Sequence, residues 1–315
     1  MLASIWDDVR RQFNSGSMVT RLVIINVVVF VVINLVHLLF YPPGTNTGSS
    51  HSALYTDILH FFCMSSDFWH ILKHPWVIIT NAFLHEGFMH ILFNMLFLYW
   101  FGRIVSDLVG DHRILPLYVL GAIAGGAIYF ITANLLPYGA DGASYALGAS
   151  AGVMAIVVAS AVLAPDYSMN LLLIGPVKLK YIVAALVFLD LISTSYSDNV
   201  GGAFAHLGGS LFGYLFVVQL RQHGNDMSQP FNKLFNGIVN FFRNLGSSGK
   251  SSKSSSKVKV AYKNKSKIFG NASSDHKIDL SHQEQLDAIL DKIKKTGYES
   301  LSDDEKEFLF KASKK

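Results

Sequence analysis

Two side chains in this 315-residue chain have the types needed for nucleophilic chemistry within apolar segments. Ser150 lies in the stretch YALGASAGVMA, among residues with almost no side chain, and His206 lies in GGAFAHLGGSLFGYLF. Polar residues inside a membrane are costly and are functional candidates by default. A serine and a histidine within hydrogen-bond reach form the minimal activated nucleophile. We therefore expect His206 to take the proton of the Ser150 hydroxyl and return it to a leaving amine.

Small residues near both side chains would let their two segments approach closely. Gly209 and Gly213 follow His206 at a small-xxx-small spacing, and Gly148 and Gly152 flank Ser150. In membrane helices such residues let backbones come together. We expect these four glycines to support the packing that brings the serine to the histidine.

A second pair could stabilise the oxyanion of acyl transfer. His90 and Asn94, in FLHEGFMHILFNMLF, are four residues apart and share one helix face. The Asn94 amide and a His90 ring N–H can donate to a developing oxyanion, and the backbone N–H of Ser150 at a helix start is a third donor. The alternative is that both side chains only join their helix to its neighbours.

A metal site is an alternative to this chemistry. His85, Glu86 and His90 resemble the HExxH zinc motif, but the histidines are five residues apart rather than four. On one helix that spacing rotates the two rings apart by roughly 140°. We therefore expect no metal site, and the acyl-transfer chemistry requires no cofactor.

Asp190 is a further carboxylate within an apolar segment. It could orient a histidine base as a third member of the site. Its position near the outer end of its segment, where water can reach it, favours an ordinary solvated carboxylate instead.

The elements that must position these residues are apolar helices. A membrane-spanning helix needs about 20 apolar residues, with a range of about 17–25. Only 15% of this chain is charged, and six segments qualify or nearly do: 18–41, 87–108, 113–136, 149–165, 179–196 and 202–221. The sequence therefore predicts an all-α polytopic membrane protein with a six-transmembrane-helix bundle.

The basic residues predict the orientation of this bundle. Lysine and arginine favour the cytoplasmic side of a membrane. With the N-terminus inside, the outer loops carry only Lys73 and the other flanking basic residues fall inside. Both termini are then cytoplasmic, and spans two, four and six start at the outer face. This places His90, Asn94, Ser150 and His206 at a similar shallow depth.

The remaining segments are expected to lie in the cytoplasm. Residues 1–17 are amphipathic and lack signal-peptide features, and 18–221 form the six-span domain. Residues 222–280 read as a Ser/Lys-rich linker, and its charge suits an anionic membrane surface better than nucleic acid. Residues 281–315 show two capping-box pairs, Ser281 with Glu284 and Ser302 with Glu305, and predict a helical hairpin. Such a short hairpin is marginal alone, so it could dock on a partner, the membrane or itself.

The pattern resembles the rhomboid family of intramembrane serine proteases over residues 18–221. The GxSx pattern matches 148–151, the AHxxGxxxG pattern matches 205–213, and the HxxxN pattern matches 90–94. The resemblance implies a six-helix fold, a Ser–His dyad without a third acid, and an oxyanion hole from Asn94, His90 and the Ser150 backbone. It also implies an outward-facing cavity with a lid near 192–203, no cofactor, and cleavage of transmembrane protein substrates.

The sequence departs from the family pattern at two positions beside the serine. Ala151 stands where many members have glycine, and Met154 stands where some have a tyrosine stacked on the histidine. The hairpin is similar to a C-terminal module of some bacterial rhomboids, which implies a bacterial inner membrane.

Two other classes of protein remain as alternatives. A non-catalytic rhomboid-like binder or chaperone of membrane helices would not need the Ser150 hydroxyl. A channel or transporter would be expected to show inverted repeats or broken helices, and the sequence shows neither.

Overall fold

The computed structural model describes residues 2–40, 53–139, 144–171, 174–196, 199–246 and 282–312. Within these ranges the chain is mostly helical, with two short antiparallel strand pairs. It divides into two compact units, Met1–Ser251 and Ser252–Lys315.

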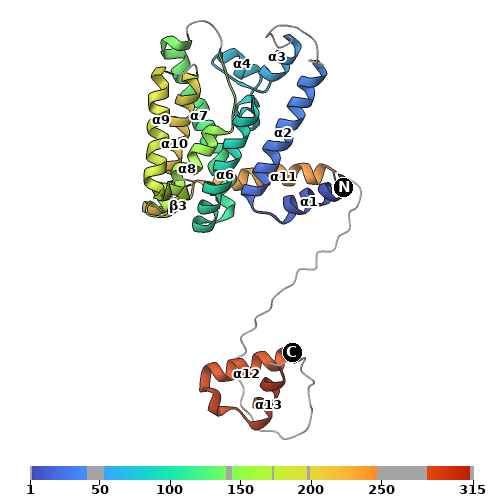
Figure 1. Ribbon diagram of the computed structural model, residues 1–315. Helices are drawn as coiled ribbons and strands as arrows, with labels where there is room; N and C mark the ends of the chain where they lie inside the picture. Colours follow the sequence, from blue (N-terminus) through green and yellow to red (C-terminus); the bar gives the residue numbers. More distant parts are fainter. Residues whose placement is uncertain are drawn as a thin grey trace. The chain divides into compact units, whose positions relative to one another are not determined.

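Apolar helices stand side by side in the first unit (Figure 1). Within the described ranges a helix occupies each of the six predicted spans: α2 (Met18–Phe40), α6 (Phe88–Val109), α7 (Ile114–Leu135), α8 (Ser150–Leu163), α9 (Leu179–Tyr196) and α10 (Val200–Gln222). Four of the described helices, α2, α6, α7 and α10, are long and apolar enough to cross a membrane, and α8 is shorter. The crossing of the membrane by all six helices remains a prediction.

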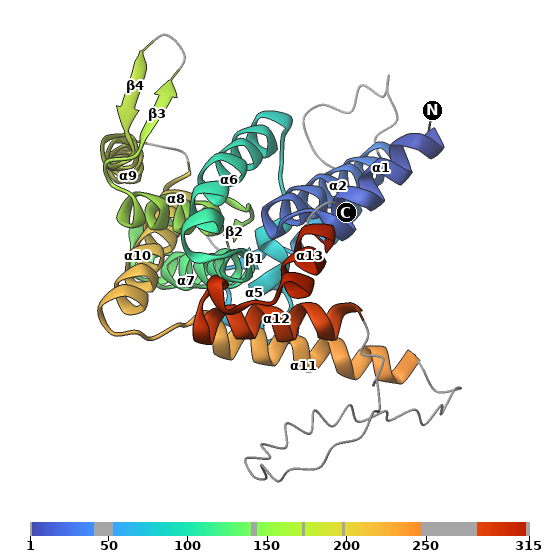
Figure 2. The ribbon, with the colours of Figure 1, turned by 90° about the horizontal axis from the view of Figure 1, so that it is seen from below.

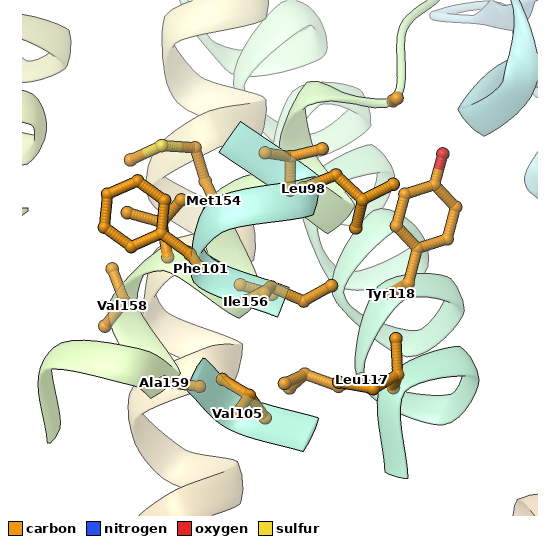
Figure 3. Packing of buried hydrophobic residues seen from close by; sticks show 14 of the residues in the cluster. Leu98, Phe101, Val105, Leu117, Tyr118, Met154, Ile156, Val158 and Ala159 are labelled. Atoms are coloured by element: carbon orange, nitrogen blue, oxygen red, sulfur yellow. The ribbon is translucent and has the colours of Figure 1, made fainter. Parts of the chain in front are cut away.

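Helix α8 lies at the centre of this bundle. Twelve of its fourteen residues are buried, whereas α2 exposes Val28, Val31 and Leu35. Lipid tails are as apolar as these side chains, so close packing rather than exclusion from water must hold α8 in place. Figure 3 shows Ile156 and Ala159 of α8 packed with Leu98, Phe101 and Val105 of α6 and Leu117 of α7.

Glycines let the neighbouring helices reach the α8 backbone. A Cβ atom added at Gly209 or Gly213 of α10 would lie closer than 3.0 Å to the carbonyl oxygens of Ala151 and Ala155. Gly152 was expected to face α10 as well, and that expectation is wrong. A Cβ atom there would lie 2.5 Å from the Tyr118 carbonyl oxygen of α7. Helix α8 is therefore clamped between α7 and α10 by glycines on different faces.

Short elements connect these helices. They are α3 (Ala53–His60), α4 (Phe68–Lys73), α5 (Val77–Thr80), the 3-10 turns η1 (Asn81–Phe83), η2 (Asp111–Arg113) and η3 (Pro137–Gly139), and strands β1 (Met64–Ser65), β2 (Tyr145–Ala146), β3 (Ser168–Leu171) and β4 (Gly175–Lys178). Strand β1 pairs antiparallel with β2, with Met64 opposite Ala146. This pairing ties the α2–α6 connection to the residues just before Ser150.

Two amphipathic helices, α1 (Leu2–Ser15) and α11 (Ser228–Gly246), lie across the lower end of the bundle (Figure 1). Helix α11 falls inside the segment 222–280, so the prediction of a linker is wrong for Ser228–Gly246. Residues 247–281, which hold the rest of that linker and the Ser281 capping position, lie outside the described residues.

The second unit contains α12 (His282–Thr296), η4 (Tyr298–Ser300) and α13 (Asp303–Ala312). The predicted Ser302–Glu305 capping box is confirmed, because the Ser302 N–H donates to Glu305 Oε2 at 2.8 Å and the Glu305 N–H donates to Ser302 Oγ at 3.3 Å. Lys292 on α12 also donates to Glu305 at 2.7 Å, and this hydrogen bond lowers the pKa of the Glu305 carboxyl.

Candidate active site

A pocket of about 790 Å³ opens where α6, α8 and α10 begin, and it contains all four predicted site side chains. Ser150, His206, His90 and Asn94 line it together with Gly148. The three helices start at the same end because they alternate in direction with the helices between them. The structure thus brings together residues that are far apart in sequence, as the predicted topology required.

Ser150 is the first residue of α8, directly after a glycine with a special backbone conformation. Gly148 has φ +139°, a region that favours glycine, and its N–H donates to the Asn81 carbonyl at 2.9 Å. A Cβ atom at position 148 would lie 3.1 Å from the His90 ring and 3.4 Å from Ser150 Oγ. Gly148 therefore keeps the space between the serine hydroxyl and the His90 ring open, a role that differs from the helix packing expected of it.

His206 is held by a carboxylate. Its Nδ1 lies 2.9 Å from Asp190 Oδ1 of α9, and the two side chains are 25% and 19% exposed. The interpretation of Asp190 as an ordinary solvated carboxylate is therefore wrong. Among the described residues no hydrogen bond joins Ser150 Oγ to His206, although both side chains line the same pocket. The sequence offered only the presence of an acidic residue in an apolar helix as a signal for this pair.

The second predicted pair lies on α6 and lines the same pocket. Asn94 is buried, and its Nδ2 donates to the His90 carbonyl at 2.9 Å. An amide NH₂ group has two donor hydrogens, so one remains for an oxyanion. The backbone N–H groups in the first turn of α8 have no partner within their helix and supply further donors.

His85 supports the His90 ring, and the sequence analysis missed this contact. Its ring packs edge to face on His90, with the centroids 5.1 Å apart. His85 and His90 do not share a helix, because α6 begins at Phe88, so the rotation of roughly 140° expected between their rings does not apply. Among the described residues no three His, Cys, Asp or Glu side chains gather in a group that could hold a metal ion.

The positions where the sequence departs from the rhomboid pattern also lie at the pocket. Met154 is buried and lines it one turn after Ser150. Most of the lid expected at 192–203 is helical, because α9 extends to Tyr196 and Asn199 caps α10 by accepting the Gly202 N–H at 2.9 Å. Residues 197–198 of that loop lie outside the described residues.

These apolar helices around a polar pocket define an integral membrane protein with a helical bundle. The chain belongs to the rhomboid family. The sequence family described as "Rhomboid domain" matches residues 72–223. The rhomboid protein YdcA of Bacillus subtilis (strain 168) is 30% identical over 144 residues, which cover 45% of this chain and 67% of that protein.

Other relatives share shorter parts of their length with this chain. RHOMBOID-like protein 12, mitochondrial, of Arabidopsis thaliana is 32% identical over 157 residues, 46% of each chain. Rhomboid protease GluP of Bacillus subtilis (strain 168) is 30% identical over 145 residues, 46% of this chain and 26% of that protein. The chain thus spans about half or less of the length of these two relatives. Residues 279–315 match DUF6576, a family of unknown function.

Proposed function

We propose that this rhomboid is an intramembrane serine endopeptidase that uses Ser150 and His206 to cut other membrane proteins. The observation that supports it is the pocket in which Ser150, His206, His90 and Asn94 meet. Several relatives, including GluP, are named as proteases. A non-catalytic binder of membrane helices is the alternative, but it gives no reason for these four side chains to share one pocket.

The reaction begins at the serine hydroxyl. Ser150 Oγ forms a bond to the carbonyl carbon of the substrate while its proton moves to His206 Nε2. The C–N bond then breaks, and the same proton passes to the leaving amine. Water attacks the resulting ester, gives its proton to His206, and releases the acid as the proton returns to Ser150.

The negative charge on the carbonyl oxygen needs preorganised donors. We expect the second N–H of the Asn94 amide, the backbone N–H of Ser150 and a ring N–H of His90 to supply them, since all three residues line the pocket. Removing one such donor costs about 10²–10³ in kcat in other acyl-transfer enzymes. Because one hydrogen of the Asn94 amide already bonds to the His90 carbonyl, the orientation of the amide is fixed before the substrate binds.

The membrane setting follows from the same topology. We propose six membrane spans, with both termini cytoplasmic and the pocket facing outward, in a bacterial inner membrane. The substrate would be a transmembrane protein cut in or beside its helix. An intact helix satisfies its own carbonyls, so the segment that is cut must first unwind. The 279–315 module would bind its own partner on the cytoplasmic side.

Cleavage in liposomes tests this function. We expect the wild type to cut labelled single-span substrates, and we expect Ser150→Ala and His206→Ala each to remove that activity. Ser160→Ala is the matched control, since Ser160 lies on the same helix, outside the pocket lining, and its hydroxyl donates to the Val157 carbonyl at 2.7 Å. Cleavage by the Ser150→Ala variant would exclude the serine mechanism. A protein that binds substrates equally well with and without Ser150, and never cuts them, would be a binder.

A further inference from the structure

The pocket holds an acidic side chain that the Ser–His mechanism does not use. We infer that Asp190 is a positioning residue for His206, so that the working unit is Ser150, His206 and Asp190. This inference rests on the proposed protease function. It is carried by the 2.9 Å contact between Asp190 Oδ1 and His206 Nδ1 and by the presence of all three side chains at one pocket.

The contact selects one form of the histidine ring. A neutral imidazole carries one N–H, and an ionised carboxylate can only accept a hydrogen bond. Asp190 therefore fixes the proton on Nδ1, which leaves the Nε2 lone pair to receive the Ser150 proton. When Nε2 takes that proton, the positive ring lies against a negative carboxylate in a site partly shielded from water, where such an interaction is stronger than in bulk water.

No other side chain in the described ranges is placed to do this. The pocket contains the titratable groups Glu86, His90, Tyr129 and Tyr145 besides the pair itself. Among the described residues, Asp190 is the only one that hydrogen-bonds the His206 ring. Without it the ring would be free to turn about its χ2 bond and to adopt the other tautomer.

Kinetics of three substitutions at this position test the role. We expect Asp190→Asn and Asp190→Ala to lower kcat by roughly 10² or more, within the 10²–10⁴ that a positioned general base contributes. KM and the thermal midpoint should be unchanged, and Asp190→Glu should recover part of kcat. Sodium formate should restore activity to Asp190→Ala but not to the wild type. If the thermal midpoint falls together with kcat and formate restores no activity, Asp190 has only a structural role.

A measurement that does not depend on catalysis separates this inference from the proposed function. The ¹⁵N spectrum of labelled histidine, with His206 assigned from a His206→Gln sample, reports which ring nitrogen carries the proton. We expect the Nδ1–H form in the wild type and its loss in Asp190→Ala. The Nε2–H form in the wild type would overturn the inference. The expected tautomer in a chain that cuts no substrate would contradict the protease function and leave the pair intact.

A second inference comes from the other end of the bundle and is independent of catalysis. We infer that α11 lies flat in the headgroup region of the leaflet away from the pocket, with its apolar face in the acyl chains of an anionic bilayer. In Figure 2, which views the bundle from below, α1 and α11 both extend across this end.

The start of α11 is fixed to the bundle. Asp226 accepts hydrogen bonds from Arg113 at 2.6 Å and from the Ser228 hydroxyl at 2.6 Å, and Asn232 donates to the His112 carbonyl at 3.0 Å. Helix α11 therefore keeps a defined position at the ends of α7 and α10 and does not belong to a free linker.

One face of α11 is apolar along its whole length. Phe231 packs against the hydrophobic core of the bundle. Phe235, Ile238 and Phe242 follow at i+4, i+7 and i+11, on the same face, and are 43%, 47% and 65% exposed. Phe231 turns this face toward the bundle. Toward the C-terminal end of α11, the same face is directed at the medium that surrounds the bundle. In a membrane protein that medium is lipid.

Charge identifies the kind of lipid. Helix α11 carries Lys233 and Arg243, seven lysines follow between residues 250 and 267, and no acidic residue occurs from 227 to 274. An amphipathic helix with basic residues at its polar boundary is attracted to anionic headgroups.

Spin labels on opposite faces of α11 test this placement in the full chain. In a Cys63→Ala background, Phe242→Cys carries a label on the apolar face and Asn236→Cys carries the control label on the polar face. In vesicles containing phosphatidylglycerol, we expect oxygen to relax label 242 more than a water-soluble nickel complex does, and the reverse at 236. Thermal midpoints establish that both variants are folded.

Two outcomes would overturn the placement. Nickel access at 242 equal to that at 236 would mean that α11 stands in water, and shielding of label 242 from both reagents would mean that a protein surface covers it. Vesicles of phosphatidylcholine alone test the charge argument. Label 242 should then become more accessible to nickel, and an unchanged accessibility would exclude a requirement for anionic lipid.

Discussion

Two carboxylates join helices at opposite ends of this bundle, and they differ in how completely they are bonded. Asp226 is 5% exposed and accepts from Arg113 Nε and Nη2 and from the N–H and hydroxyl of Ser228. Within the part of the chain that the structure describes, Asp190 accepts one hydrogen bond, from His206, and it is 19% exposed in a pocket. The first carboxylate has its acceptor sites occupied by fixed donors, whereas the second holds a group that can gain and lose a proton.

This difference indicates that the Arg113–Asp226 pair has a structural role, whereas the His206–Asp190 pair can take part in a reaction. Arginine stays protonated at any pH that a protein experiences, so the Arg113–Asp226 pair can only fix the chain. A histidine ring can accept a proton and return it during a reaction, and His206 faces the pocket that contains Ser150. We therefore expect substitutions at Asp226 to change stability and substitutions at Asp190 to change the rate of cleavage.

The largest effect is expected at the contact between α8 and α10, because both stability and the position of Ser150 depend on it. Gly209→Ala places a Cβ atom against the Ala151 carbonyl oxygen of α8, and a helix backbone cannot yield locally. We expect the unfolding free energy to fall by roughly 3 kcal/mol, at the upper end of overpacking costs. Cleavage should fall by about 10²-fold, because small displacements of catalytic groups are costly. Thermal midpoints in detergent and liposome assays measure the two effects.

Gly237→Ala is the matched control for that substitution. It makes the same change within a helix, α11, where a new Cβ atom meets nothing within 4 Å. Alanine is favoured over glycine in a helix by about 0.5–1 kcal/mol, so stability should be unchanged or slightly raised. Equal destabilisation by both variants would mean that the α8–α10 contact is looser than the structure shows.

An intermediate effect is expected at the saturated carboxylate. Asp226→Asn keeps the shape of the side chain but removes its charge and leaves Arg113 without a carboxylate. We expect the unfolding free energy to fall by about 1–3 kcal/mol, the cost of breaking hydrogen bonds to buried charged groups. The kcat of the folded protein should not change. A loss of kcat without loss of stability would reverse the comparison between the two carboxylates.

The stabilising effect of Asp226 should also depend on pH. Burial raises the pKa of this carboxyl, but hydrogen bonds from Ser228 and Arg113 outweigh it and hold the pKa below the ordinary value of 3.8. A group whose pKa is lowered on folding contributes stability above its unfolded pKa and loses it as the pH falls through the folded pKa. The thermal midpoints of the wild type and Asp226→Asn should therefore differ at neutral pH and converge below pH 3.8.

The sequence was sufficient for the features that depend on order along the chain. Helices are present at all six predicted segments within the described residues, because the length of an apolar run does not depend on its neighbours. His90, Asn94, Ser150 and His206 share a pocket because alternating helices start at alternate ends. Their chemical roles remain predictions.

Features that depend on helix rotation could not be predicted in this way. Gly152 faces α7 rather than α10, and Asp190 faces His206 rather than water. Both outcomes depend on how far each helix turns about its axis, which sequence spacing does not specify. His85 contacts His90 because α6 begins three residues after His85. Helix α11 was missed because the serines and lysines that follow it dominated the composition of the segment.

The smallest effect is expected at a third carboxylate, which serves as an exposed reference for Asp226 and Asp190. Asp166 accepts from Lys178 at 3.0 Å and Lys180 at 2.8 Å, and these hydrogen bonds lower the pKa of Asp166. Its side chain is 64% exposed, so water and salt compete for the same charges and exposed pairs of this kind contribute little. Asp166→Asn should therefore leave both the thermal midpoint and the rate of cleavage unchanged. A change in either would mean that hydrogen bonds from two lysines stabilise the protein even in solvent. The number of hydrogen bonds, rather than exposure, would then explain why Asp226 and Asp190 differ.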